Sequence, residues 1–231
     1  MTTKRLLLVM AACTLARASA QQAPPAPAAA VAVAVDPDLK LEGASPEQAD
    51  LIQRAKAELD RVLDSDDFRK AIERATFEGR RLRLANGDIQ EPDNAEILKI
   101  ILEGRERQTQ ADNKMTLDVR LRELRRGTVG STRLGSVGKI TTSYWFVNRC
   151  VEGNDPYSMA GHLAHEWMHK AGFTHYPDNS ARGDVPYEVG QIVRKLARDE
   201  QTAKNKALGL SAEYDRLPGY LLDEAEDEVI D

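Results

Sequence analysis

The sequence predicts an α+β fold, because helical patterns fill the first half of the chain, strand patterns follow them, and a further helix comes after the strands. Of the 231 residues, 42% are hydrophobic and 30% are charged, which suffices for one sizeable core. We therefore expect one folded domain over residues 45–222, with N-terminal helices, a small mixed or antiparallel sheet and a helix after it.

Three helices are predicted by capping residues that precede apolar side chains at helical spacing. Ser45-Pro46-Glu47-Gln48 has the form of a capping box, in which the Ser and Gln side chains each satisfy a backbone N–H at the helix start. The apolar residues that follow are Leu51, Ile52, Ala55, Leu59, Val62 and Leu63. Ser65 and Asp93 are the expected N-caps of a second and a third helix.

Two segments have strand patterns. Residues 117–124 alternate between apolar and polar side chains, which predicts a half-buried strand. Residues 139–148 are rich in β-branched and aromatic side chains, and we expect a second strand there. It is either a core strand or the edge of a cleft that binds an extended peptide through main-chain hydrogen bonds. We interpret the glycines between the two segments as turn residues: Gly127, Gly130, Gly135 and Gly138.

A helix is predicted over residues 156–171. Asp155 followed by Pro156 is typical of an N-cap and first turn, and Gly172 suits a left-handed cap at the end. On a helical wheel one side carries Ala160, Leu163, Ala164, Trp167 and Ala171, and the opposite side carries His162, His165 and His169. We expect the apolar side to pack, with Trp167 as a core anchor, and the histidine side to bind.

Residues His165 to His175 read H-E-x-x-H-x-x-G-x-x-H. Residues four apart on a helix share a face, so the imidazoles of His165 and His169 can bind one zinc ion. Gly172 lets the chain turn sharply after the helix, and His175 is then the expected third ligand. A carboxylate from Asp178 or Glu188 is the alternative third ligand.

Two further side chains are candidates for catalysis. Glu166 lies beside the ligands and is suited to act as general base for hydrolysis of an amide. Tyr187, at the start of the next predicted helix, is a candidate donor to an oxyanion, the alternative being a structural tyrosine. His162 lies about 10 Å along the helix from His169, too far to share one zinc ion. We expect it to support the site or to be a partly exposed histidine.

The motif resembles that of the metzincin clan of zinc endopeptidases at every specified position. The resemblance implies a zincin-like α+β fold, zinc bound by His165, His169 and His175, and Glu166 as the base. Metzincins also have a methionine turn after the third histidine, whereas this chain has no Met after Met168 and has Pro186-Tyr187 at that place. Residues 145–149, 160–170 and 185–193 are also similar to secreted bacterial proteins assigned as metallopeptidases, a resemblance that covers about residues 90–200.

The termini indicate export. Residues 1–20 have a basic start, an apolar run and Ala18-Ser19-Ala20, the pattern of a signal peptide; acylation of Cys13 as a lipid anchor is the alternative. We interpret residues 21–44, rich in Ala and Pro, as a flexible linker and residues 223–231 as a solvated acidic tail. After processing, Cys150 would be the one remaining unmodified thiol.

Charge and hydropathy limit the partners. The net charge of −5 and pI near 5.5 argue against a nucleic-acid partner, and no segment has the length and apolar character of a membrane span. We therefore expect a secreted or periplasmic zinc endopeptidase whose partner is a peptide or protein substrate. Two alternatives stay open: a zinc amidase that acts on cell-wall peptide, and a catalytically silent, zinc-stabilised envelope protein that binds a partner.

Overall fold

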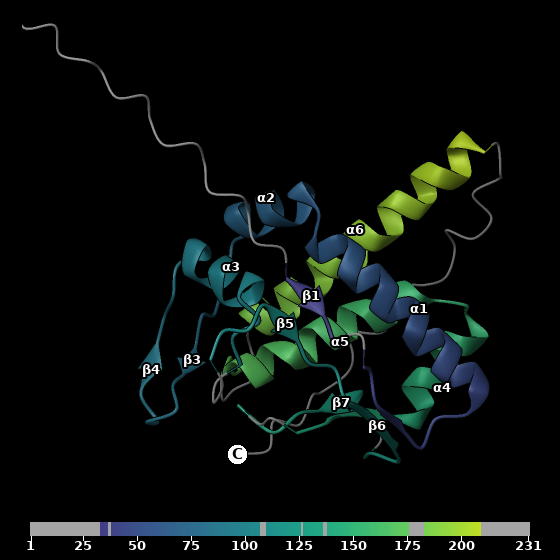
Figure 1. Ribbon diagram of the computed structural model, residues 1–231, viewed down its shortest axis with the longest axis horizontal. Coiled ribbons are helices and arrows are strands. Elements are labelled where there is room, and N and C mark those ends of the chain that lie inside the picture. The colour runs from purple at the N-terminus through teal and green to yellow at the C-terminus, as the bar shows by residue number, and fades with distance from the viewer. Residues whose placement is uncertain are drawn as a thin grey trace, which may run out of the picture. The chain divides into compact units, whose positions relative to one another are not determined.

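The α+β prediction is confirmed. The computed structural model describes residues 33–36, 38–106, 110–125, 127–135, 138–175 and 183–208. The helices among these residues are α1 (Pro46–Leu63), α2 (Asp66–Arg74), α3 (Asn94–Leu102), α4 (Tyr144–Glu152), α5 (Pro156–Ala171) and α6 (Val185–Ala207) (Figure 1). The strands are β1 (Ala34–Val35), β2 (Leu41–Glu42), β3 (Leu82–Arg83), β4 (Ile89–Gln90), β5 (Lys114–Met115), β6 (Val119–Arg122), β7 (Gly130–Ser131) and β8 (Ile140–Ser143).

The described strands form small sheets. The largest has the order β2-β6-β8-β7, in which β6 is parallel to both β2 and β8, while β7 is antiparallel to β8. β1 and β5 form a parallel pair, and β3 and β4 form an antiparallel hairpin. Within the four-stranded sheet, β7 is an edge strand and lies in contact with α5.

The predicted caps of the first three helices are confirmed. Ser45 and Gln48 form the reciprocal capping box of α1, with the Ser45 N–H donating to the Gln48 side chain over 2.7 Å. The Ser65 hydroxyl accepts from the Phe68 N–H at the start of α2, and the Asp93 carboxylate accepts from the Glu96 N–H at the start of α3. Each cap satisfies a backbone donor that the helix itself leaves without a partner.

The prediction of one strand over residues 139–148 is wrong after Ser143. The strand β8 ends there, and the Ser143 hydroxyl caps α4 by accepting from the Phe146 N–H. Phe146, Val147 and Cys150 are buried at helical spacing, so packing overrides the strand preference of their side chains. Because β8 lies between β6 and β7, the core-strand interpretation holds and the cleft-edge interpretation does not.

Two strands lie where the sequence indicated a linker. β1 pairs with β5 and β2 pairs with β6, and Val33 and Val35 are buried in the core. The alternation of Val and Ala over residues 31–35 is a strand pattern, which the surrounding prolines obscured. The expected signal peptide (residues 1–20), the Cys13 anchor, the first part of the linker and the acidic tail (residues 223–231) lie outside the described residues.

The crossing of α5 and α6 is the most extensive contact between helices and depends on two glycines. A Cβ atom at Gly161 would lie 2.7 Å from the carbonyl oxygen of Gly190, and one at Gly190 would lie 2.9 Å from the carbonyl oxygen of Gly161. Side chains at these positions would force the helices apart. The glycines therefore let the first turns of α6 lie directly against α5. Among the described residues, none of the helices is long and apolar enough to span a bilayer.

Gly161→Ala tests this crossing. Replacement of Gly by Ala inside a helix normally stabilises by roughly 0.5–1 kcal/mol, but here we expect the added methyl group to overpack the contact and lower the free energy of unfolding by about 1–3 kcal/mol. Urea unfolding followed by circular dichroism measures the change. Lys206→Ala, at the exposed end of α6, is the control and should stay within about 0.5 kcal/mol of the parent. A Gly161→Ala protein as stable as the parent would contradict the argument.

Candidate metal centre

Helix α5 carries the first two candidate ligands and has the bounds that the sequence predicts. The Asp155 carboxylate accepts from the Ser158 N–H over 3.0 Å at its start. Gly172 ends the helix with φ of 109°, a left-handed conformation that residues with a side chain resist. Nearly every residue of α5 is buried, including both faces of the predicted wheel. The histidine face is therefore covered by protein and is not an open surface.

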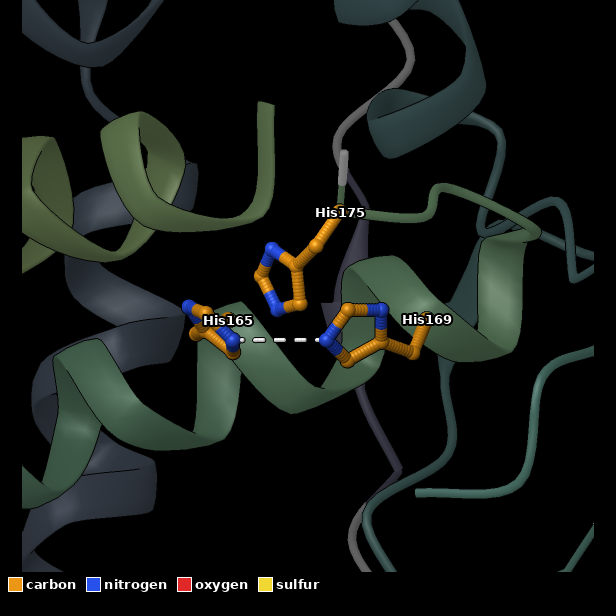
Figure 2. A group of neighbouring side chains, drawn as sticks. All are labelled: His165, His169 and His175. Carbon is orange, nitrogen blue, oxygen red and sulfur yellow. Dashed lines mark hydrogen bonds between the residues drawn. The ribbon is translucent and has the colours of Figure 1, made fainter. Parts of the chain in front are cut away.

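The side chains of the three predicted histidine ligands lie close together. His165 and His169 lie one turn apart on α5, and their Nε2 atoms are 3.3 Å apart, while His175 reaches toward them from the segment after the helix (Figure 2). One potential ligand atom from each ring lies within 4.8 Å of the others. Two ligands of a tetrahedral ion with bonds of about 2.0–2.1 Å are separated by about 3.3–3.4 Å. The His165–His169 separation already has this value.

Hydrogen bonds at Nδ1 set the protonation of two of these rings. His169 Nδ1 lies 2.8 Å from the Phe173 carbonyl oxygen, and His175 Nδ1 lies 2.7 Å from Asp184 Oδ2. Since a carbonyl or a carboxylate only accepts, each Nδ1 donates, and in the neutral ring Nε2 is then the nitrogen that presents a lone pair. Metal-binding histidines in proteins are held in the same way.

The donor set fits a metal ion. His175 Nε2 is buried and has no hydrogen-bond partner among the described residues, and it faces the two other imidazoles. A buried lone pair without a partner is costly, and a cation shared by the three rings would remove that cost. We conclude that His165, His169 and His175 form a buried group that can hold a metal ion.

The segment 79–83 holds the third histidine and the start of α6 in place. The Arg83 N–H donates to the Gly172 carbonyl over 2.8 Å, and the Thr174 N–H donates to the Arg81 carbonyl over 2.9 Å. The Val185 N–H donates to the Gly79 carbonyl over 3.0 Å. One segment, residues 79–83, is therefore hydrogen-bonded to the stretch before residue 176 and to the stretch after residue 182. These hydrogen bonds bring His175 and Asp184 together.

Asp184 is a residue of the candidate site that the sequence prediction did not single out. Its Oδ1 atom caps α6 by accepting from the Tyr187 N–H over 3.3 Å, while Oδ2 accepts from His175. The side chain is 1% exposed. The sequence Asp184-Val185-Pro186 is itself a helix-start pattern, but a pattern of this kind does not reveal which histidine the second carboxylate oxygen contacts.

Acidic side chains lie around Asp184, the carboxylate that contacts His175. Burial, together with the like charges of Glu78 and Asp184, raises the pKa of Glu188. These carboxylates favour a cation at the histidine group over an anion. Glu188 is not part of the group that can hold a metal among the described residues, and Asp178, the other alternative third ligand, lies outside them.

Tyr187 lies against two of the candidate ligands. Its ring centroid is 4.7 Å from that of His165, in an edge contact, and 4.7 Å from that of His175, in a tilted contact. The structure thus places this predicted site residue at the centre. The Tyr187 ring packs against the imidazoles. The sequence has no methionine after Met168 that could take this place.

Glu166 is enclosed on the same helix. It is fully buried, and its Oε1 atom lies 3.9 Å from His162 Nδ1. A Cβ atom at Gly130 would collide with Glu166 Oε1 and with His162, so this glycine is a packing residue of β7 and not the expected turn residue. His162 is also fully buried, which rules out the expectation of partial exposure. Its Nε2 atom lies 3.0 Å from the Thr142 hydroxyl.

The opposite face of α5 packs in the core as predicted, and Trp167 and Lys170 also make polar contacts there. Trp167 is fully buried and its indole N–H donates to Glu106 over 3.2 Å. The buried Lys170 ammonium lies 3.2 Å from the same Glu106 carboxylate and donates to the Thr116 carbonyl over 2.7 Å. These contacts satisfy a charge that would otherwise be costly to bury. They attach the rear of the ligand helix to the segment before β6.

Comparison with known proteins gives no relative: no family model, no curated protein and no solved structure matches this chain.

His175→Ala should weaken metal binding strongly while leaving the fold intact, because it removes the ligand that converts a two-histidine site into a three-histidine site. Metal stoichiometry after gel filtration, with Zn²⁺ as the probe, measures the effect. His162→Ala is the matched control and should keep the bound Zn²⁺, since His162 is hydrogen-bonded to Thr142 and is not in the candidate ligand group. Retention of one tightly bound Zn²⁺ by His175→Ala would remove His175 from the ligand set.

Asp184→Asn should lower the affinity for Zn²⁺ by about 10- to 100-fold, because the amide keeps a helix cap but holds the His175 ring less strongly than a carboxylate. Competition with a chromophoric chelator measures the affinity. Asp155→Asn, at the N-cap of α5, changes the same chemical group away from the ligands and should leave the affinity near that of the parent. Equal affinities for the two variants would show that the Asp184–His175 contact has no effect on metal binding.

Proposed function

We propose that this protein is a secreted or periplasmic zinc endopeptidase that hydrolyses peptide bonds in peptide or protein substrates. The observation that carries the proposal is the close approach of three imidazoles, whose potential ligand atoms lie within 4.8 Å of one another, in the spacing H-E-x-x-H-x-x-G-x-x-H. Imidazole ligands suit zinc, and three of them leave a coordination place for catalysis. The resemblance to metzincins supports the same assignment.

The proposed roles follow from the chemistry of each side chain. His165, His169 and His175 would hold a zinc ion, which would supply Lewis-acid polarisation of a substrate carbonyl and a lowered pKa of a water molecule. Glu166 takes a proton from the attacking water and delivers it to the leaving amine. The Tyr187 hydroxyl donates a hydrogen bond to the oxyanion that forms on the substrate carbonyl. Asp184 and the Phe173 carbonyl keep two of the ligand rings in the metal-binding tautomer.

One observation favours a second candidate. Glu166 and His165 are fully buried, which suits a metal that stabilises the fold of a catalytically silent envelope protein. The two functions differ in whether substrate reaches Glu166. His175 and Tyr187 are the more exposed members of the site, and substrate would approach from their side.

Glu166→Gln should keep zinc and fold but reduce hydrolysis by about 10²- to 10⁴-fold, since the amide cannot accept the proton of water. Casein zymography and cleavage of quenched peptides, with and without phenanthroline, measure the activity. Glu200→Gln, on the surface of α6, is the control and should act as the parent.

The alternatives give different results when a panel of peptidoglycan substrates is tested beside the panel of casein and peptides. A parent protein that releases peptide only from peptidoglycan is an amidase of cell-wall peptide. A parent protein that binds zinc and is inert toward both substrate panels is the silent binding protein, and the endopeptidase assignment is then wrong.

A further inference from the structure

We propose that His162 is a positioning residue for Glu166, and that its neutral ring accepts a hydrogen bond from Thr142 at Nε2 while its Nδ1–H is directed at Glu166 Oε1. The inference rests on the proposed function, because it concerns the side chain that is assigned there as the general base. It gives a role to the fourth histidine, which is not part of the candidate ligand group.

Thr142, His162 and Glu166 follow one another in the buried interior, with the His162 ring between the other two side chains. His162 precedes Glu166 by one turn of α5, and its Nδ1 atom is 3.9 Å from Oε1. On the far side of the ring, Nε2 is 3.0 Å from the hydroxyl of Thr142, a residue of β8. All three side chains are fully buried. Contacts around a general base are often long in the unliganded site and shorten when substrate binds.

The surroundings of His162 hold the ring in this position. The Phe146 ring on α4 lies against it, with centroids 4.9 Å apart and an angle of 60° between the planes. Gly130 on β7 contacts both His162 and Glu166, and its lack of a Cβ is what allows the strand to cover them. Four elements, α4, α5, β7 and β8, therefore fix the ring, so its direction toward Glu166 is built into the fold.

A buried general base needs such a partner. A carboxylate in a dry interior is stabilised by a donor, and a donor at one oxygen also fixes the plane of the group. We assign Oε1 to His162 and Oε2 to the proton transfer. Thr142 completes the arrangement, because a hydroxyl that donates to Nε2 keeps the ring proton on Nδ1.

The tautomer of His162 can be measured without any assay of activity. Long-range ¹H–¹⁵N correlation spectra distinguish protonated from unprotonated ring nitrogens, and comparison with His162→Asn assigns the ring. We expect the proton on Nδ1 in the Zn²⁺-loaded protein, and a loss of this preference in Thr142→Val but not in Thr142→Ser. A wild-type ring that carries a proton on Nε2 overturns the inference.

Kinetics of variants separate positioning from packing. His162→Leu fills the space without a donor, whereas His162→Asn keeps an N–H near the place of Nδ1. We expect His162→Leu to keep Zn²⁺ and lose about 10- to 100-fold in kcat with KM little changed, and His162→Asn to restore most of the loss. A leucine variant as active as the asparagine variant shows that His162 only fills space, and the inference is then wrong.

The two proposals fail in different ways. A parent protein that cleaves no peptide removes the endopeptidase assignment, while the ring spectra still decide whether His162 donates toward Glu166. If His162→Leu does not fold, the Thr142→Val and Thr142→Ser pair, measured by the same spectra and by kcat, takes its place: a fall in kcat in Val alone supports the inference, and equal values overturn it.

Discussion

The close crossing of α5 and α6 is the constraint on which the metal centre depends. Two histidines on one helix can meet a metal without help, but the third arrives from the segment after α5 and is held by Asp184 at the start of α6. Gly161 and Gly190 let the helices approach until backbone meets backbone. The first turn of α6 is thereby placed where the Asp184 carboxylate reaches His175 and the Tyr187 ring reaches His165.

Burial of the ligand helix has a cost that the fold must offset. Polar and charged groups on α5 lie in the interior, where each one that lacks a partner destabilises the folded state. The partners come from several segments: the Phe173 carbonyl for His169, the Thr142 hydroxyl for His162, and Glu106 with the Thr116 carbonyl for Lys170. The polar contacts therefore also fix where β8 and the segments that contain Glu106 and Thr116 pack against the helix.

The sequence predicted those features that local chemistry controls. Capping residues gave the starts of α1, α2, α3 and α5, and the spacing of the histidines gave the triad that the structure brings together. The sequence could not reveal contacts that depend on tertiary packing. The contact of Gly130 with Glu166 and the pairing of Asp184 with His175 each join segments that are separated along the chain, and no local pattern encodes such a contact. The end of β8 did have a local signal, the N-cap Ser143, but the β-branched and aromatic side chains after it favoured a strand.

Neighbours of different kinds orient the three candidate ligand rings. The Tyr187 ring contacts His165 by its edge and His175 at a tilt. His169 is oriented by a backbone carbonyl and His175 by a carboxylate. Tyr187 supplies a contact that limits rotation of the His165 ring, since an aromatic pair prefers an edge-to-face arrangement. The three rings are thus held by chemically different neighbours: a ring edge contact at His165, a backbone carbonyl at His169 and a carboxylate at His175.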